Sequence, residues 1–135
     1  MNTVNKLVAA WNTGDIKQIA ACYAQDVVFQ HVMVPEPLQG REAFIAFEGA
    51  MFQAFSQIDW KAVSVVGTGD SVALEFQVSA TNSAAMQSPN GPIPATHKRI
   101  TVKGVSMLKL NGKGEIAEER RYLDTASMFK QLGLA

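Results

Sequence analysis

The sequence holds 135 residues, of which 47% are hydrophobic and 18% charged, a composition typical of one globular domain and not of a disordered chain. Its twelve basic and twelve acidic residues cancel, so no net field draws it to nucleic acid or to an anionic membrane. The single cysteine, Cys22, excludes an internal disulfide, and neither a signal peptide nor a membrane-spanning apolar run is visible. We therefore expect a single cytoplasmic domain over residues 1–135, with no nucleic acid and no membrane among its partners.

The first part of the sequence predicts helices. Apolar residues at positions 4, 7, 8 and 11 have the spacing of an amphipathic helix, which Thr13 and Gly14 end. Asp15 suits the N-cap of a second helix running to about residue 25. After a strand over 27–32, the longest helix is predicted over 40–55, where one apolar stripe also includes Glu48.

The second part predicts strands. They are expected over 60–66, 71–81, 96–110 and 115–124, with Gly-containing turns at 67–70 and 111–114, and a short helix or tail follows from residue 125. Helices first and strands after, without alternation, predict an α+β fold with the helices on one face of a mainly antiparallel sheet.

The final strand carries polar residues on both of its faces. We expect the face that ends in Asp124 to look toward the helices, so that sheet and helices enclose a pocket with a polar end. One face consists of Ala117, Glu119, Arg121 and Leu123, and the other, which we place inside, of Ile116, Glu118, Arg120, Tyr122 and Asp124.

An ordered set of short motifs resembles the SnoaL-like proteins over roughly residues 3–134. This is the polyketide-cyclase and ester-cyclase branch of the nuclear transport factor 2-like superfamily, which also contains ketosteroid isomerase, scytalone dehydratase and limonene epoxide hydrolase. The resemblance lies in the order of the motifs, since no single one is diagnostic. They are Trp-Asn-x-Gly-Asp at 11–15, Tyr-Ala-x-Asp-Val-Val-Phe at 23–29, Gly-x-Glu-Ala-Phe at 40–44, Glu-x-Arg-x-Tyr-x-Asp at 118–124 and Gln-Leu-Gly-Leu at 131–134.

The resemblance implies a cone-shaped α+β barrel, in which a strongly curved sheet wraps around the N-terminal helices. It further implies an internal apolar pocket that opens at one end and, usually, a homodimer formed through the sheet. An exposed sheet face with Leu108, Leu110 or Leu123 makes such a dimer plausible. The resemblance is less specific about chemistry, because proteins of this fold catalyse several reactions and some have no catalytic activity.

Asp124 is the first catalytic candidate. The resemblance places it at the acid/base aspartate of the SnoaL-like cyclases, and burial beside an apolar pocket would raise its pKa toward the useful range. The other interpretation is that Asp124 caps the C-terminal helix by accepting a backbone N–H bond from Ala126 or Ser127. The sequence leaves both interpretations open.

His31 is the second acid/base candidate, because the first strand of the related families often sends a polar side chain into the pocket. A hydrogen-bonded histidine that lines the pocket without a catalytic role is the alternative. Tyr122 and Arg120 are predicted to bind substrate, and the Tyr122 ring could equally be a packed aromatic. The candidate cavity walls are Trp60, Phe76, Met107, Met51, Phe47 and Phe55.

Other chemistries have no signature in this sequence. Two distant histidines and one cysteine predict no metal site, and the Gly-rich turns lack the pattern of phosphate-binding loops. The resemblance implies a cofactor-free enzyme that cyclises or isomerises a small hydrophobic carbonyl compound by acid/base catalysis. The alternatives are a non-catalytic ligand-binding or dimerisation module of the same fold, and an epoxide hydrolase-like activity.

Overall fold

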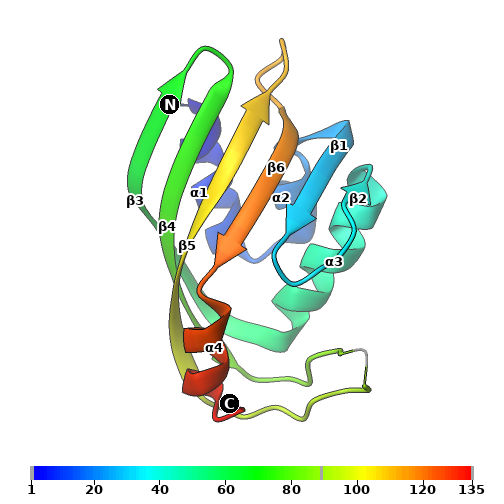
Figure 1. Ribbon diagram of the computed structural model, residues 1–135, viewed down its shortest axis with the longest axis vertical. Helices are drawn as coiled ribbons and strands as arrows, with labels where there is room; N and C mark the ends of the chain where they lie inside the picture. The colour runs from blue at the N-terminus through cyan, green and yellow to red at the C-terminus, as the bar shows by residue number, and fades with distance from the viewer. Residues whose placement is uncertain (1, 89, 135) are drawn as a thin grey trace.

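The computed structural model describes residues 2–88 and 90–134, and shows the first three helices packed against one face of a curved six-stranded sheet, with the C-terminal helix at one end of the sheet (Figure 1). Amphipathic spacing explains the first helix, whose apolar side chains face the sheet. The elements in chain order are α1 (Asn2–Thr13), α2 (Ile16–Ala20), β1 (Tyr23–His31), β2 (Leu38–Gln39), α3 (Arg41–Ala54), β3 (Phe55–Thr68), β4 (Ser71–Asn82), β5 (Arg99–Leu110), β6 (Ile116–Leu123) and α4 (Thr125–Leu132).

The sheet has the strand order β2-β1-β6-β5-β4-β3. β1 runs parallel to β6, and all other neighbours are antiparallel. The predicted α+β class is confirmed, with a sheet that stays open and has β2 and β3 as its edges. Two register shifts in β3 increase the twist of this edge, as β-bulges do.

The core consists of two clusters of buried side chains. The larger one lies between α1, α2, α3 and the sheet and is rich in aromatic residues, among which Trp11 stacks on Trp60 with ring centroids 4.0 Å apart. The smaller one joins α4 to β5 and to Met86 of the loop between β4 and β5. The space between these clusters contains the cavity described below.

Two boundaries differ from the prediction. The second helix was expected to reach residue 25, but it ends at Ala20, and β1 begins at Tyr23 instead of at residue 27. Tyr23 is completely buried, with its ring 4.0 Å from that of Phe44, so packing against α3 prevails over helical spacing at this position. The two-residue strand β2 was not predicted, because so short an edge strand has no sequence pattern of its own.

The outer face of the sheet is not the one expected from its leucines. Leu108 is buried, and Leu110 and Leu123 pack against the core, so the proposed exposed face with these three residues is wrong. The exposed apolar side chains of the outer face instead include Met107 and Tyr122, which flank the β5–β6 pairing. Strand alternation alone did not reveal which set faces the helices.

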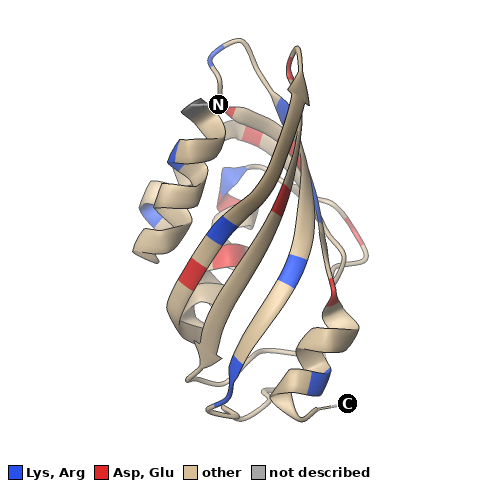
Figure 2. Cartoon of the chain, turned by 90° about the vertical axis from the view of Figure 1, so that its left-hand side faces the viewer, with Lys and Arg blue, Asp and Glu red and all other residues tan. Residues whose placement is uncertain are grey.

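Charged residues of both signs are spread along strands and helices (Figure 2). In the part of the chain that the structure describes, no helix is long and apolar enough to cross a membrane.

Gly104 is the position where the sheet tolerates no side chain. A Cβ atom there would lie 2.5 Å from the carbonyl oxygen of Tyr122 and 2.7 Å from the Phe76 ring. We predict that Gly104→Ala lowers the free energy of unfolding by about 2 kcal/mol, measured by denaturant titration, because a backbone atom must move. Gly112→Ala is the matched control, since a Cβ there meets nothing within 4 Å. Equal stability of the two variants would contradict the close packing of β5 against its neighbours.

Candidate functional site

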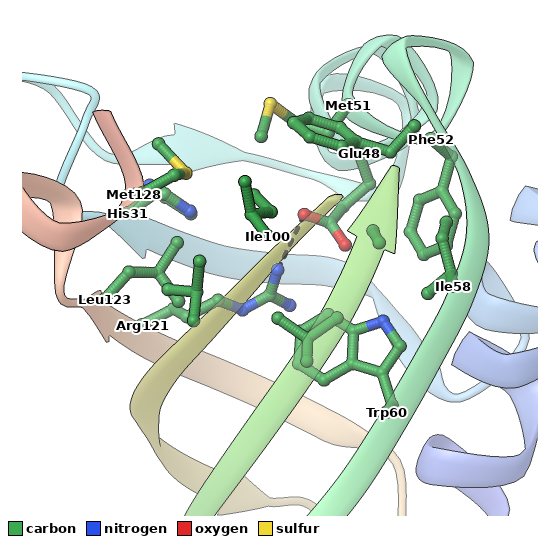
Figure 3. A pocket seen from close by; sticks show the side chains of 14 residues that line it. His31, Glu48, Met51, Phe52, Ile58, Trp60, Ile100, Arg121, Leu123 and Met128 are labelled. Atoms are coloured by element: carbon green, nitrogen blue, oxygen red, sulfur yellow. Dashed lines mark hydrogen bonds and ion pairs between the residues drawn. The ribbon is translucent and has the colours of Figure 1, made fainter. Parts of the chain in front are cut away.

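A cavity of about 80 Å³ lies between α3, α4 and the inner face of the sheet. Apolar side chains form most of its wall, and three polar residues from three different elements project into it (Figure 3). These are His31 of β1, Glu48 of α3 and Arg121 of β6. The remaining lining residues are Met51, Phe52, Phe55, Ile58, Trp60, Val78, Ala80, Ile100, Val102, Leu123 and Met128.

Arg121 is buried at the polar end of this cavity. Its Nη1 donates to Glu48 Oε1 at 2.7 Å and its Nε to Glu119 Oε2 at 2.9 Å, so one guanidinium joins two buried carboxylates. The guanidinium carbon also lies 5.2 Å from the ring centroid of Trp11 and 5.0 Å from that of Phe29, within cation–π range. The two carboxylates raise the pKa of Arg121, which therefore stays charged.

Glu119 lies behind Arg121, away from the cavity. It accepts hydrogen bonds from the Tyr23 hydroxyl, from Ser106 Oγ at 2.7 Å and from Arg121 Nε. A carboxylate with donors on both oxygens is the form in which a buried negative charge is tolerated. The pKa of Tyr23 is raised well above its ordinary value, by burial and then by the charge of Glu119, so the hydroxyl keeps its proton and donates.

Glu48 is the buried carboxyl group with a free oxygen. Its Oε1 accepts from Arg121, while its Oε2 is buried and has no hydrogen-bond partner among the described residues. Burial raises the pKa of Glu48, an effect that Arg121 opposes. A carboxyl group of this kind holds its proton more tightly than an exposed one, which suits a general acid/base.

His31 is 4% exposed and borders the same cavity. Its Nδ1 accepts the backbone N–H of Met33 at 3.1 Å, so the neutral ring carries its hydrogen on Nε2. Burial and then the nearby Arg121 lower the pKa of His31 to about 3. Near neutral pH, His31 is therefore an uncharged hydrogen-bond donor and not an effective base.

The cavity combines a carboxyl group of raised proton affinity with a neutral imidazole donor in apolar surroundings. This pair can remove a proton from a bound molecule and stabilise the negative charge that develops on an oxygen atom of it. Among residues 2–88 and 90–134, no group of three or more His, Cys, Asp or Glu side chains converges to hold a metal ion.

The structure brings only part of the predicted site to this cavity. His31 and Trp60 line it, together with Met51 and Phe55. Phe76 is buried instead in the larger core cluster, 4.6 Å from the Trp60 ring, and Phe47 packs on His31 at 4.9 Å.

The prediction for the faces of the final strand is wrong. Glu119 and Arg121 point inward, whereas Glu118, Arg120 and Tyr122 lie on the outer face, as does Met107. Because both faces of β6 carry charged residues, alternation does not show which face points inward. The strand is oriented by its ion pairs: Arg121 binds Glu119 on the same strand and the buried Glu48 of α3.

Asp124 is exposed and does not line the cavity. It is the N-cap of α4, where its Oδ1 accepts the backbone N–H of Ser127 at 3.1 Å. The helix-cap interpretation of Asp124 is therefore confirmed, and the burial that the catalytic interpretation expected is not found.

Sequence reasoning missed Glu48, Glu119 and Arg121 as site residues. One signal was available: Glu48 occupies the apolar stripe of α3, where an unpaired carboxylate would be costly. Such a position indicates either a buried ion pair or a functional group, and here it is both paired and open to the cavity.

A cone-like α+β fold with a cavity between helices and an open, curved sheet defines the nuclear transport factor 2-like class. The model of the SnoaL-like domain family matches residues 4–119, and the chain belongs to this family. No curated protein matches this sequence.

Solved structures show the same fold at low sequence identity. A protein from Jannaschia sp. CCS1 that is assigned as a SnoaL-like polyketide cyclase is 18% identical, with a TM-score of 0.85 over 99% of this chain and 91% of that one. TsrD from Streptomyces laurentii is 19% identical, with a TM-score of 0.82 over 99% and 94%. A ketosteroid isomerase-like protein from Catenulispora acidiphila, solved with trimethylamine, is 19% identical, with a TM-score of 0.80 over 98% and 93%.

The low pKa of His31 predicts a pH dependence of stability. The His31 side chain binds a proton near pH 6.5 in the unfolded chain but only near pH 3 in the folded protein. Lowering the pH between these two values therefore favours unfolding. The contribution of His31 to the free energy of unfolding is constant above pH 6.5. It falls by up to about 1.4 kcal/mol per pH unit between pH 6.5 and pH 3. We predict that His31→Gln reduces this slope in denaturant titrations between pH 4 and pH 6.5.

The control for this experiment is His97→Asn. His97 is exposed and has a positive φ of 59°, a backbone conformation that asparagine accepts. It should keep the slope of the original protein, and an unchanged slope in His31→Gln would contradict the neutral, buried state of His31.

Proposed function

We propose that this protein is a cofactor-free enzyme that cyclises or isomerises a small, largely apolar carbonyl compound by acid/base catalysis. The observation that supports this most is the unpartnered Oε2 of Glu48 in an apolar cavity that also contains the neutral His31. The fold is compatible with this chemistry, and members of the same fold class differ in what they do.

In the proposed reaction, ionised Glu48 takes a proton from the carbon next to the carbonyl group. The electrons of the broken C–H bond form a C=C bond, and the carbonyl π electrons move to the oxygen, where Nε2–H of His31 stabilises the enolate. In an isomerisation, Glu48 returns the proton to a different carbon. In a cyclisation, the enolate carbon attacks a second carbonyl group of the same molecule, and the new alkoxide takes the proton.

Arg121 holds Glu48 in position for this task. Its bond to Oε1 fixes the carboxyl group and leaves Oε2 as the reactive oxygen. Arg121 favours the carboxylate, while burial favours the acid. The two effects oppose each other, as a group that must both accept and return a proton requires.

An epoxide hydrolase-like activity is the second candidate. One observation favours it: Glu48, Arg121 and Glu119 form a carboxylate–guanidinium–carboxylate chain, the kind of constellation used around a water molecule in epoxide hydrolysis of the limonene type. Glu119 does not line the cavity, so in that reaction Glu48 would take a proton from water as the water attacks the ring, and would pass this proton to the oxygen of the opened ring.

The proposal predicts hydrogen exchange without a cofactor. In D2O, the protein should exchange the α-hydrogens of a small cyclic ketone such as cyclohexanone or decalone, followed by the loss of their proton NMR signals. Glu48→Gln removes the base and keeps a similar shape, so it should slow exchange by about 100-fold or more. Glu42→Gln, at an exposed position of the same helix, is the matched control and should exchange at the original rate.

Three results would change the assignment. Exchange that survives in Glu48→Gln and disappears in Asp124→Asn would assign the proton transfer to Asp124. Saturable ketone binding without exchange would indicate a binding module. Label from H2¹⁸O in the diol formed from a small apolar epoxide, without ketone exchange, would indicate the hydrolase.

We also propose that the protein forms a homodimer through the outer face of its sheet. Met107 and Tyr122 are 37% and 47% exposed there, and Val66 of β3 is 67% exposed on the row that runs through Ala73 and Met107. A shallow hollow between β3, β5 and β6 includes Met107 and Arg120 and offers a surface that a second copy can fill.

The dimer predicts a mass change in solution. In size-exclusion chromatography coupled to light scattering, the original protein should have the mass of two chains and Met107→Glu the mass of one. The substitution should separate the dimer because the new carboxylate would lose its hydration in the interface. Met33→Glu introduces the same charge at an exposed apolar residue outside the sheet and should stay dimeric. A single-chain mass for the unmodified protein would refute the dimer.

A further inference from the structure

We infer that Glu119 is a positioning residue, which holds the Arg121 guanidinium in place and limits how much of its charge acts on Glu48. Glu119 does not line the cavity, so it cannot touch a bound molecule. Its influence on the reacting carboxyl group passes through Arg121. The inference rests on the proposed function in assigning the proton transfer to Glu48.

Glu119 is anchored from three sides in the core. The Tyr23 hydroxyl of β1 donates to its Oε1, while Ser106 Oγ of β5 donates to its Oε2 at 2.7 Å, the same oxygen that accepts from Arg121. None of its own surface is exposed. Because these bonds fix the carboxylate, they also fix the direction in which Arg121 extends toward Glu48.

One cation, Arg121, is shared between two anions, Glu48 and Glu119. Arg121 and Glu119 face Glu48 from β6, while β1 contributes the hydroxyl of Tyr23 and the neutral imidazole of His31. With both glutamates ionised, this buried group carries a net charge of −1. Protonation of Glu48 makes it neutral, so the charge of Glu119 favours the protonated form.

Removal of the Glu119 charge should therefore free Arg121 to pair with Glu48 alone. The carboxylate of Glu48 becomes more stable, and the group holds its proton less tightly. A base that loses its proton affinity in this way is still in place but accepts protons less readily from a carbon atom.

Glu119→Gln is suited to this test because the amide can keep the hydrogen bonds. Its oxygen can take the position of Oε2 and accept from Ser106 and Arg121, while its NH2 takes the position of Oε1 and donates to the Tyr23 oxygen. The substitution thus removes the charge and preserves the shape.

The experiment is a pH titration followed by ¹³C NMR of protein labelled at the glutamate δ-carbons, with the Glu48 signal identified by its loss in Glu48→Gln. We expect Glu119→Gln to lower the titration midpoint of Glu48 by roughly one pH unit, the scale of a lost neighbouring charge. Tyr23→Phe removes one hydrogen bond and no charge, and should leave the midpoint within a few tenths of a unit.

Glu119→Asp provides a second variant in case Glu119→Gln does not fold. It keeps the charge but withdraws it by one methylene group, so the Glu48 midpoint should fall by less than in the amide variant. An unchanged midpoint in the folded variants, or an equal shift in Tyr23→Phe, would overturn the inference. The titration needs no substrate, so its result stands apart from the ketone-exchange test of Glu48.

Discussion

A buried cation must be neutralised inside the protein, and for Arg121 this requirement links the helical layer to the sheet. Leaving it unpaired would cost several kcal/mol, so Glu48 of α3 and Glu119 of β6 both have to reach it. α3 can satisfy this only in one rotation about its axis, the rotation that places Phe44 and Glu48 against the sheet. Burial of apolar area drives the packing, while the ion pairs select its register.

The same requirement explains how the protein's own side chains hold the polar end of the cavity together. Each polar group there is held by another element: β1 supplies Tyr23 and His31, β5 supplies Ser106, and α3 supplies Glu48. Networks of this kind are rigid when fully satisfied. Glu48 Oε2 is the buried carboxylate oxygen that lacks a hydrogen-bond partner among the described residues, which is why we assign it the chemical role.

Local patterns predicted the architecture well, because helical spacing, glycine turns and strand alternation are properties of short segments. The α+β class, the long helix and the four later strands follow from them. The orientation of β6 does not, since Arg120 and Arg121 are both charged and adjacent. Arg121 is buried and Arg120 is exposed because Arg121 pairs with Glu48, which lies 73 residues away in the chain. No local pattern contains that information. His31 was found because the first strand of the related families often sends a polar side chain into the pocket, and because the ordinary pKa of histidine suits proton transfer.

The two ends of the cavity are built by different parts of the core. Its polar groups contact aromatic rings of the larger cluster: Arg121 lies over Trp11 and Phe29, and His31 lies beside Phe29. Ile100, Val102 and Met128, at the end covered by α4, belong to the smaller cluster. Substitutions at these three positions change the size and shape of the cavity without altering a charge or a hydrogen bond of the polar end. The groups that we propose to transfer the proton can therefore stay the same while these three residues vary, so one polar end can serve cavities of different shapes.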